Sequence, residues 1–321
     1  MRRLEAFSGV QVLTYCLMSN HFHLLVRVPC KERQAALTEK QLREFLPLLY
    51  SDRGLAHVRQ ELDRACDAAV GGSPRWLDEI LARYDARRYD LSSFLKDLKQ
   101  RFSQWYNART TRSGHLWESA FRSVLVEDGE EALLTIAAYI DLNPVRAGFC
   151  ADPKDYQWSC YGEAFGNGAG GAGSNLRQRR IGRDQSRQGI SEMLRHTAFG
   201  KNRPLTWKNV GSRYRDLLYA GGERRDADPV RGTVGRPGLS HEAVDAELAR
   251  VREPSLAEVL HKRVRYFSEG GVIGSGEFVE KVFEENRGQF GERRTVGAQT
   301  MGGANWGPLR VLRRLNGRTI G

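Results

Sequence analysis

Two histidines separated by one residue are the first groups in the sequence that could do chemistry. His21 and His23 lie in the apolar stretch "TYCLMSNHFHLLVRV" at 14–28. If this stretch is a buried strand, residues two apart point to the same face, roughly 6.6 Å apart along the backbone. Two neutral imidazoles on one face can bind a single divalent ion, while Phe22 between them faces the core. The pair therefore indicates part of a metal site.

A structural interpretation of the pair stays open, in which each histidine makes its own hydrogen bonds on the strand. An isolated His-x-His pattern is weak evidence for a metal, and this interpretation would ordinarily be preferred. The apolar surroundings favour the ligand role here, because burying an imidazole without a partner costs about 1–3 kcal/mol. The residue types do not identify the metal.

A tyrosine and an asparagine further along supply two more candidate groups. Tyr139 and Asn143 lie four residues apart in "AAYIDLNPVRAG" at 137–148 and would share one face of a helix. A tyrosine hydroxyl beside a metal-bound phosphate can act as a covalent nucleophile. An asparagine carbonyl is a hard ligand that suits Mg²⁺ or Mn²⁺. The alternative is that Tyr139 only packs on an amphipathic helix.

Several segments of the first half have the patterns of the elements that must position these residues. Short apolar runs bounded by turn residues predict strands, and apolar residues at helical spacing predict helices. The predicted helix that carries Tyr139 has acidic residues in its first turn and a stop at Pro144. We expect strands at 10–18, 22–28 and 121–128, and helices at 90–107 and 129–143.

Charge and glycine content divide the chain at one place. Residues 1–170 hold 22 Lys or Arg and 22 Asp or Glu, so the whole net charge of +11 lies in residues 171–321. The run "GNGAGGAGSN" at 166–175 is typical of a flexible linker. We therefore expect a first domain at 1–165 and a basic, mainly helical accessory region at 176–321. This region either binds DNA or is a solvated accessory domain.

The start of the basic region contains "RQRRIGRDQSR" at 177–187, whose arginines Arg177, Arg179 and Arg180 are suited to phosphate contacts. The five cysteines form no CxxC pair, which fits reduced thiols in the cytosol. The sequence contains no apolar run long enough to span a membrane and no apolar leader at its start. We expect a cytoplasmic protein without a membrane partner.

Three motifs in order resemble those of a known family. The stretches "YCLMSNHFHLLV", "GHLWESAFRSVLVED" and "YIDLNPVRAG…DPKDYQWSCY" are similar to the single-tyrosine transposases of the HUH superfamily, and most similar to the REP-associated tyrosine transposase branch. The resemblance covers about residues 5–165. It implies the α+β class with a ferredoxin-like core, in which the sheet carries the histidine pair and a later helix carries the tyrosine.

The resemblance also implies an activity and roles for particular residues. His21 and His23 match the histidine pair of the family, Tyr139 matches its nucleophile, and Asn143 falls where a polar residue completes the metal site. Such enzymes cleave single-stranded DNA with Mg²⁺ or Mn²⁺, typically near a hairpin. They form a 5′-phosphotyrosine and a free 3′-OH and then rejoin strands. Relatives outside this branch often work as dimers, whereas the branch can be monomeric, so the resemblance favours a monomer.

Further DNA contacts are expected from "GHLWESAFRS" at 114–123. His115, Trp117 and Arg122 lie there, and aromatic rings stack on unpaired bases while arginines hold phosphates. The alternative is that Trp117 packs within the protein.

The sequence departs from the family at its beginning. The family core usually starts with a strand and most of a helix before the segment that matches "RRLEAFSGVQVL", and few residues precede that segment here. We therefore expect the first core strand to be missing. Two other functions stay open: a catalytically inactive, truncated descendant that only binds hairpin DNA, and a metal-dependent hydrolase without a covalent step.

Overall fold

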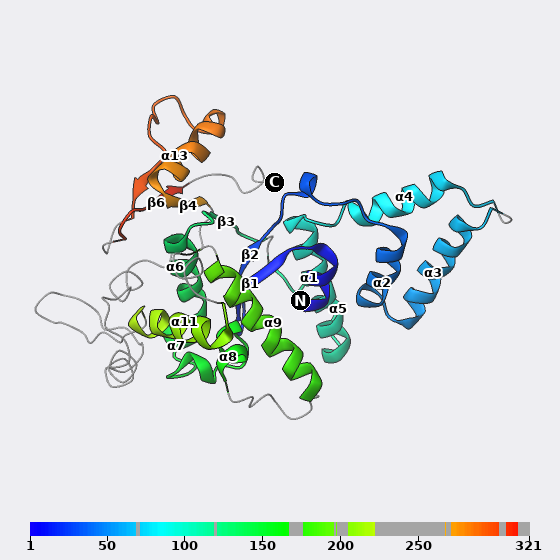
Figure 1. Cartoon of the computed structure of the whole chain (residues 1–321), viewed down its shortest axis with the longest axis horizontal. Helices are drawn as coiled ribbons and strands as arrows, with labels where there is room; N and C mark the ends of the chain where they lie inside the picture. Colours follow the sequence, from blue (N-terminus) through cyan, green and yellow to red (C-terminus); the bar gives the residue numbers. More distant parts are fainter. Residues whose placement is uncertain are drawn as a thin grey trace, which may run out of the picture. The chain divides into compact units, whose positions relative to one another are not determined.

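The computed structural model describes most of the chain, and its helices and strands are shown in Figure 1. It has the α+β class that was expected. The side chains of residues 176–179 and 220–221 lie outside the description. The described residues are 1–68, 71–118, 121–166, 176–195, 197, 205–221, 267, 271–301 and 306–313.

The chain forms two compact units, each described here by itself. The first, called the helical unit, consists of 1–12 and 26–121, and the second, called the mixed unit, consists of 13–25 and 122–320. These units do not follow the predicted domains at 1–165 and 176–321. Of the predicted linker at 166–175, only Gly166 lies within the described residues, so that boundary stays a prediction.

The helical unit is built from amphipathic helices with identifiable N-caps. Thr38 and Gln41 form a capping box at the start of α2, and the Asp90 side chain accepts from the Ser93 amide at the start of α5. The apolar sides of these helices bury Leu42 and Leu46. The helices are α1 (Arg2–Ser8), α2 (Glu39–Leu49), α3 (Asp52–Cys66), α4 (Pro74–Asp85) and α5 (Leu91–Thr110), and the last of these confirms the predicted helix at 90–107.

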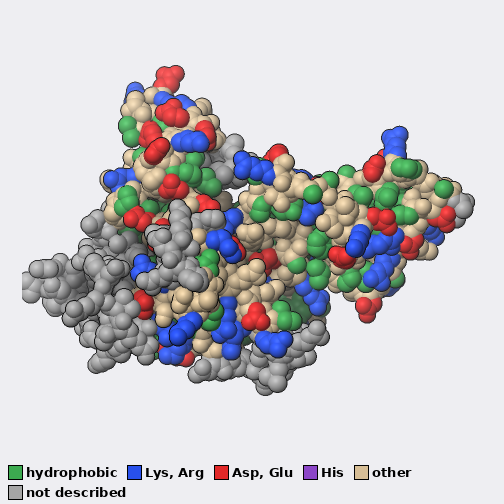
Figure 2. All heavy atoms as spheres, viewed as in Figure 1, with side chains coloured by type: hydrophobic (Ala, Val, Ile, Leu, Met, Phe, Trp, Pro, Cys, Tyr) green, Lys and Arg blue, Asp and Glu red, His purple; other side chains and the backbone are tan. Residues whose placement is uncertain are grey.

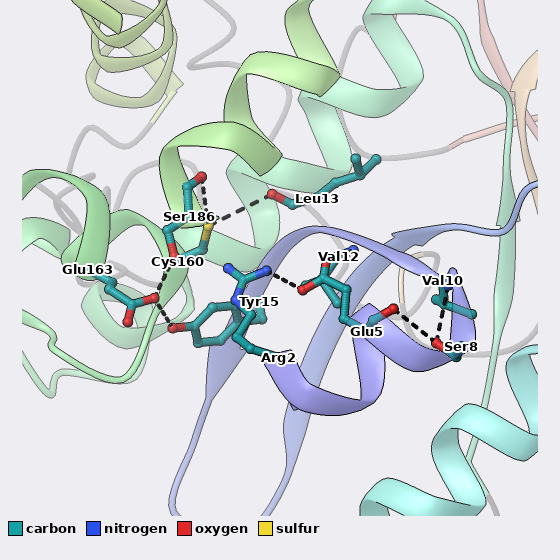
Figure 3. A network of polar contacts seen from close by, with 10 residues as sticks. All are labelled: Arg2, Glu5, Ser8, Val10, Val12, Leu13, Tyr15, Cys160, Glu163 and Ser186. Carbon is teal, nitrogen blue, oxygen red and sulfur yellow. Dashed lines mark hydrogen bonds and ion pairs between the residues drawn. The ribbon is translucent and has the colours of Figure 1, made fainter. Parts of the chain in front are cut away.

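Polar contacts hold the first residues of the helical unit together (Figure 3). Arg2 donates to the Glu5 carboxylate at 2.8 Å, and the same carboxylate accepts from the Val12 amide at 2.7 Å. The Ser8 hydroxyl accepts from the Val10 amide at 3.1 Å. Glu5 therefore fixes α1 against the first residues of the strand that follows.

The histidine pair lies at the start of the second strand of a hairpin, with His23 in the strand and His21 directly before it. Strands β1 (Gln11–Leu17) and β2 (Phe22–Arg27) pair with each other, and the Met18 amide donates to the His21 carbonyl at 2.8 Å. The interior of β1 is buried, but in β2 only Leu25 is. The expectation of a fully buried second strand was wrong, because among the described residues β2 pairs only with β1.

Helices of the mixed unit surround the helix that carries Tyr139. This helix, α6 (Glu130–Asp141), is buried at every residue from Ala132 to Asp141 because its sequence is apolar on all sides. It confirms the predicted helix at 129–143, and Pro144 begins a separate short helix. The other helices described here are α7 (Asn143–Arg146), α8 (Cys160–Phe165), α9 (Leu176–Arg195) and α11 (Trp207–Gly221).

A four-stranded sheet in the mixed unit joins segments far apart in the sequence. Strand β3 (Val124–Val126) pairs in parallel with β4 (Gly271–Ser275), with Val124 opposite Gly271. Strand β6 (Leu309–Arg313) pairs with β4 and with β5 (Gln299–Thr300), both antiparallel. Helix α13 (Gly276–Glu285) packs on this sheet through Val279 and Phe283. The strand order is β3-β4-β6-β5.

The prediction for region 176–321 was mainly helical and named no strand there. Among the described residues, helices α9, α11 and α13 agree with it, but residues 271–275 form β4, between two neighbouring strands. Val272 and Ile273 are both buried, so this short run does not alternate between apolar and polar residues as a half-buried strand would. Periodicity alone cannot distinguish such a strand from a buried helix. Residues 256–266 lie outside the described part.

Candidate metal and nucleophile site

The two histidines converge through their outer ring nitrogens. His21 Nε2 lies 3.1 Å from His23 Nε2, and the two rings are nearly perpendicular at 89°. His21 Nδ1 lies 2.7 Å from Asn20 Oδ1. Because an amide oxygen only accepts, His21 donates through Nδ1–H and carries its lone pair on Nε2. Asn20 therefore orients one imidazole in the tautomer that a metal ligand requires.

The separation of the two nitrogens fits a shared divalent ion. Adjacent ligands of an octahedral ion with bonds of 2.0–2.1 Å lie about 3 Å apart, and the two Nε2 atoms are 3.1 Å apart. Within the described residues no three His, Cys, Asp or Glu side chains come together as a metal site. Among the described residues, a third ligand would therefore be of another type, such as the Asn143 amide oxygen. Such a donor set suits Mn²⁺ better than Mg²⁺, which prefers oxygen throughout.

The electrostatics keep His23 neutral. Burial, together with the nearby His21 and Arg146, lowers the pKa of His23 to about 4. A neutral imidazole is the form that binds a metal. His21 is exposed rather than buried, so the cost of burying it, on which the sequence argument depended, does not apply. The distance between the two Nε2 atoms, rather than burial, favours a ligand role for His21.

Tyr139 lies beside the histidine pair. Its ring centroid is 5.7 Å from that of His23, in an edge-to-face arrangement. The Arg146 guanidinium lies over the Tyr139 ring at 4.8 Å, and the Phe267 ring packs against it with centroids 4.8 Å apart. The Tyr139 side chain is enclosed by these neighbours and only 2% exposed. The predicted nucleophile and the predicted metal ligands therefore belong to one cluster.

Two neighbours act on the hydroxyl of Tyr139. Burial raises the pKa of Tyr139, while the Arg146 charge and a hydrogen bond from Asn143 lower it. Asn143 Nδ2 also donates to the Tyr139 carbonyl at 3.0 Å, which confirms that the two residues lie one helical turn apart. The Asn143 side chain thus contacts the candidate nucleophile through its amide nitrogen.

A buried carboxylate holds the helix of Tyr139 in place. Thr14 in β1 donates to Asp141 Oδ1 at 2.8 Å, and Tyr214 in α11 donates to Asp141 Oδ2 at 2.5 Å. All three residues are fully buried. Burial raises the pKa of Asp141, and the hydrogen bonds from Tyr214 and Thr14 partly offset this effect. The resulting pKa is about 7. This network joins strand β1 to α6 and α11.

Replacing this carboxylate is expected to change how stability depends on pH. The pKa of Asp141 is about 7 in the folded protein and about 4 in the unfolded chain. Between these values the folded state retains a proton that the unfolded state has lost, so the free energy of unfolding falls as pH rises and levels off above pH 7. Urea unfolding at pH 5 and pH 8 should show Asp141→Asn gaining about 2–3 kcal/mol relative to wild type over this interval.

The exposed Asp184 on α9 provides a control for this prediction. Asp184→Asn should show the same pH dependence as wild type. Parallel pH profiles for Asp141→Asn and wild type would contradict the assignment of a proton to Asp141.

A second network of polar contacts surrounds Tyr15, the one tyrosine of β1 (Figure 3). Tyr15 donates to the Glu163 carboxylate at 2.7 Å, and Ser186 in α9 donates to the same carboxylate oxygen at 2.5 Å. Cys160 Sγ contacts the carbonyls of Leu13 and Ser186 at 3.8 and 3.7 Å. Tyr15 is buried, and its hydroxyl is hydrogen-bonded to Glu163. It therefore supports β1 against α8 and α9 and is a weaker candidate nucleophile than Tyr139.

The other candidate DNA-binding residues come from both compact units. His115 is exposed and Trp117 half-buried, and both belong to the helical unit. Trp117 Nε1 donates to the Lys99 carbonyl at 3.0 Å, which favours the packing interpretation of this residue. Arg122 is exposed directly before β3.

The arginines of the predicted basic run are described only in part. Arg180 is exposed on α9, whereas the side chains of Arg177 and Arg179 lie outside the description.

Three residues in or beside the cluster were not predicted from the sequence as site residues. Arg146 lies seven residues after Tyr139, a spacing that places two residues on the same side of a helix and was a usable signal. Asp141 is the one acid in the apolar run "LLTIAAYIDL", which also signals a buried partner. No local pattern identifies Phe267, since its contact with Tyr139 depends on tertiary structure alone.

No protein-family model, no curated protein and no solved structure matches the chain. Among the described helices, none is both long enough and apolar enough to cross a membrane.

Proposed function

We propose that this chain is a metal-dependent transposase or endonuclease that cleaves and rejoins single-stranded DNA beside a hairpin. The observation that supports the proposal best is the cluster of His21, His23 and Tyr139, in which a paired imidazole site lies against a tyrosine ring at 5.7 Å. The strand and the helix that carry these groups come from separate parts of the sequence. The motif resemblance supports the same activity.

In the proposed reaction the Tyr139 hydroxyl oxygen attacks the phosphorus of the scissile phosphodiester. A bond forms between this oxygen and phosphorus, the bond from phosphorus to the 3′ oxygen breaks, and the leaving oxygen gains a proton. The products are a 5′-phosphotyrosine and a free 3′-OH. Because the phosphotyrosine is itself a phosphodiester, a 3′-OH can attack it in the reverse sense and rejoin strands without ATP.

The residues around Tyr139 have distinct roles in this proposal. His21, His23 and Asn143 would hold Mg²⁺ or Mn²⁺, which when bound supplies positive charge to polarise the phosphate. Arg146 stabilises the phenolate that forms as the hydroxyl loses its proton. The Tyr139 side chain is 2% exposed, so substrate must displace a neighbouring side chain such as Phe267 to reach the hydroxyl.

The enclosure of Tyr139 also favours a second candidate, a descendant that binds hairpin DNA without cleaving it. In that case burial keeps the Tyr139 hydroxyl protonated and out of reach, and the basic half of the chain supplies the affinity. The two candidates differ in whether a covalent complex forms.

End-labelled DNA separates these possibilities. A single strand with one hairpin is labelled at its 5′ end or at its 3′ end, incubated with Mn²⁺ or Mg²⁺, and run on a denaturing gel. We expect the 3′-labelled strand to become attached to the protein and the 5′-labelled strand to yield a free fragment. Binding without cleavage would support the inactive descendant, and cleavage without attachment would support a hydrolase; either outcome would contradict the proposal.

A further inference from the structure

An open cavity of about 240 Å³ lies between helices α8, α9 and α11 of the mixed unit. It is separate from the cluster around Tyr139. The described residues that line it include no Asp or Glu. Those that carry aromatic, cationic or hydroxyl groups are Phe165, Arg187, Trp207, Lys208, Ser212 and Arg215.

Two aromatic rings form an apolar wall of the cavity. The ring centroids of Phe165 and Trp207 are 4.9 Å apart. Gly211 permits this arrangement, since a Cβ at that position would lie 3.3 Å from each of the two rings. The guanidinium of Arg187 lies over the Trp207 ring at 4.9 Å, and that of Arg215 lies over the Phe165 ring at 5.3 Å. The wall is therefore held by contacts within the protein.

The cavity concentrates positive charge. Arg187, Lys208 and Arg215 line it together with the exposed Ser212 hydroxyl. Arg187 is fixed by a bond from its Nε to the Ala164 carbonyl at 3.3 Å. Burial and the nearby Arg183 charge lower the pKa of Arg187, so an anion beside it would be favourable. In Figure 2, Lys and Arg side chains lie on the face where α8 and α11 are seen in Figure 1.

We propose that this cavity binds single-stranded DNA, with a backbone phosphate held by Arg187, Lys208 and Arg215. A neighbouring base lies against the aromatic wall at Trp207. The identification of the ligand as DNA rests on the proposed function. The cavity and its aromatic and cationic lining are observed independently of that function. The site would hold the substrate strand at a distance from the residues that cleave it.

Aromatic groups beside cations favour a single strand over other anions. Base stacking needs a base whose face is free, and in a duplex that face is covered by its neighbours. An open cavity also lets the strand continue in both directions, which a closed mononucleotide pocket does not. A positively charged groove with stacking aromatic rings is the usual way of binding single strands without sequence preference.

Fluorescence anisotropy with a labelled, unstructured oligonucleotide of about 12 nucleotides tests this site without cleavage. Lys208→Glu and Ser212→Asp change exposed residues, so the fold is preserved. We expect each to weaken binding by about 10-fold at low salt. Trp207→Ala should weaken it by about 5- to 100-fold.

The matched control is Lys281→Glu, which makes the same charge change on α13 at a side chain that is 73% exposed. It should stay within about two-fold of wild type. Equal losses in Lys208→Glu and Lys281→Glu would show that only net charge matters and would overturn the inference, as would unchanged binding in both Lys208→Glu and Trp207→Ala. Competition by a mononucleotide as strong as by the oligonucleotide would also overturn it.

The same assay distinguishes this inference from the proposed function. Tyr139→Phe should bind the oligonucleotide as wild type does. If the chain forms no covalent complex and Lys208→Glu still weakens binding, the cleavage proposal fails and the binding site stands.

Discussion

Tyr139→Phe is expected to abolish the covalent protein–DNA complex and to reduce strand cleavage by at least about 10⁴-fold. The substitution removes the one oxygen that the proposal assigns as nucleophile and leaves the ring, which contacts His23, Arg146 and Phe267. The fold should be retained, because the hydroxyl is the only atom lost. The measurement is the rate at which end-labelled hairpin DNA is cleaved and attached to protein.

A second tyrosine shows whether the effect is specific. Tyr106 lies on α5 in the helical unit, where its ring stacks on Phe102 with centroids 6.0 Å apart. Tyr106→Phe makes the same chemical change and should cleave at the wild-type rate. A covalent complex that persists in Tyr139→Phe at the wild-type rate would exclude Tyr139 as the nucleophile.

His23→Ala is expected to have the second largest effect. The loss of one of two converging imidazoles removes a metal ligand, and charge stabilisation by a metal contributes several kcal/mol to a phosphoryl transition state. Cleavage should fall by at least about 10³-fold, while binding of single-stranded DNA should remain. Binding of Mn²⁺, measured by calorimetry or by electron paramagnetic resonance, should weaken in parallel with activity.

The exposed His57 on α3 is the control for this substitution. His57→Ala removes an imidazole far along the sequence from the pair and should leave both Mn²⁺ affinity and cleavage unchanged. If His23→Ala binds Mn²⁺ as tightly as wild type, the 3.1 Å contact between the two Nε2 atoms is only a hydrogen bond between histidines.

The sequence predicts the local elements of the candidate site well. The hairpin is marked by two apolar runs around a Ser-Asn turn, and the structure places strands at Gln11–Leu17 and Phe22–Arg27. The helix of Tyr139 is marked by its acidic first turn and by Pro144, and it spans Glu130–Asp141. Each of these signals depends on neighbours within a few residues, so a single sequence contains them.

Several contacts that position the candidate site are not local in sequence. The pairing of β3 with β4 joins residues near 125 to residues near 272, and nothing in either short run specifies the other. The enclosure of Tyr139 depends on Phe267, which is distant in sequence. Burial of β2 was overestimated because the number of strands that pair with it is a tertiary property. The ferredoxin-like core and the missing first strand stay predictions.

The central claim is that Tyr139 forms a covalent bond to DNA, and peptide mass spectrometry of the trapped complex tests it most directly. After nuclease and trypsin digestion, cleavage at Arg122 and Arg146 releases the peptide 123–146, in which Tyr139 is the only tyrosine. We expect this peptide to carry a nucleotide remnant joined through phosphate to Tyr139. A remnant on another residue, or a cleaved strand with no peptide attached, would contradict the account.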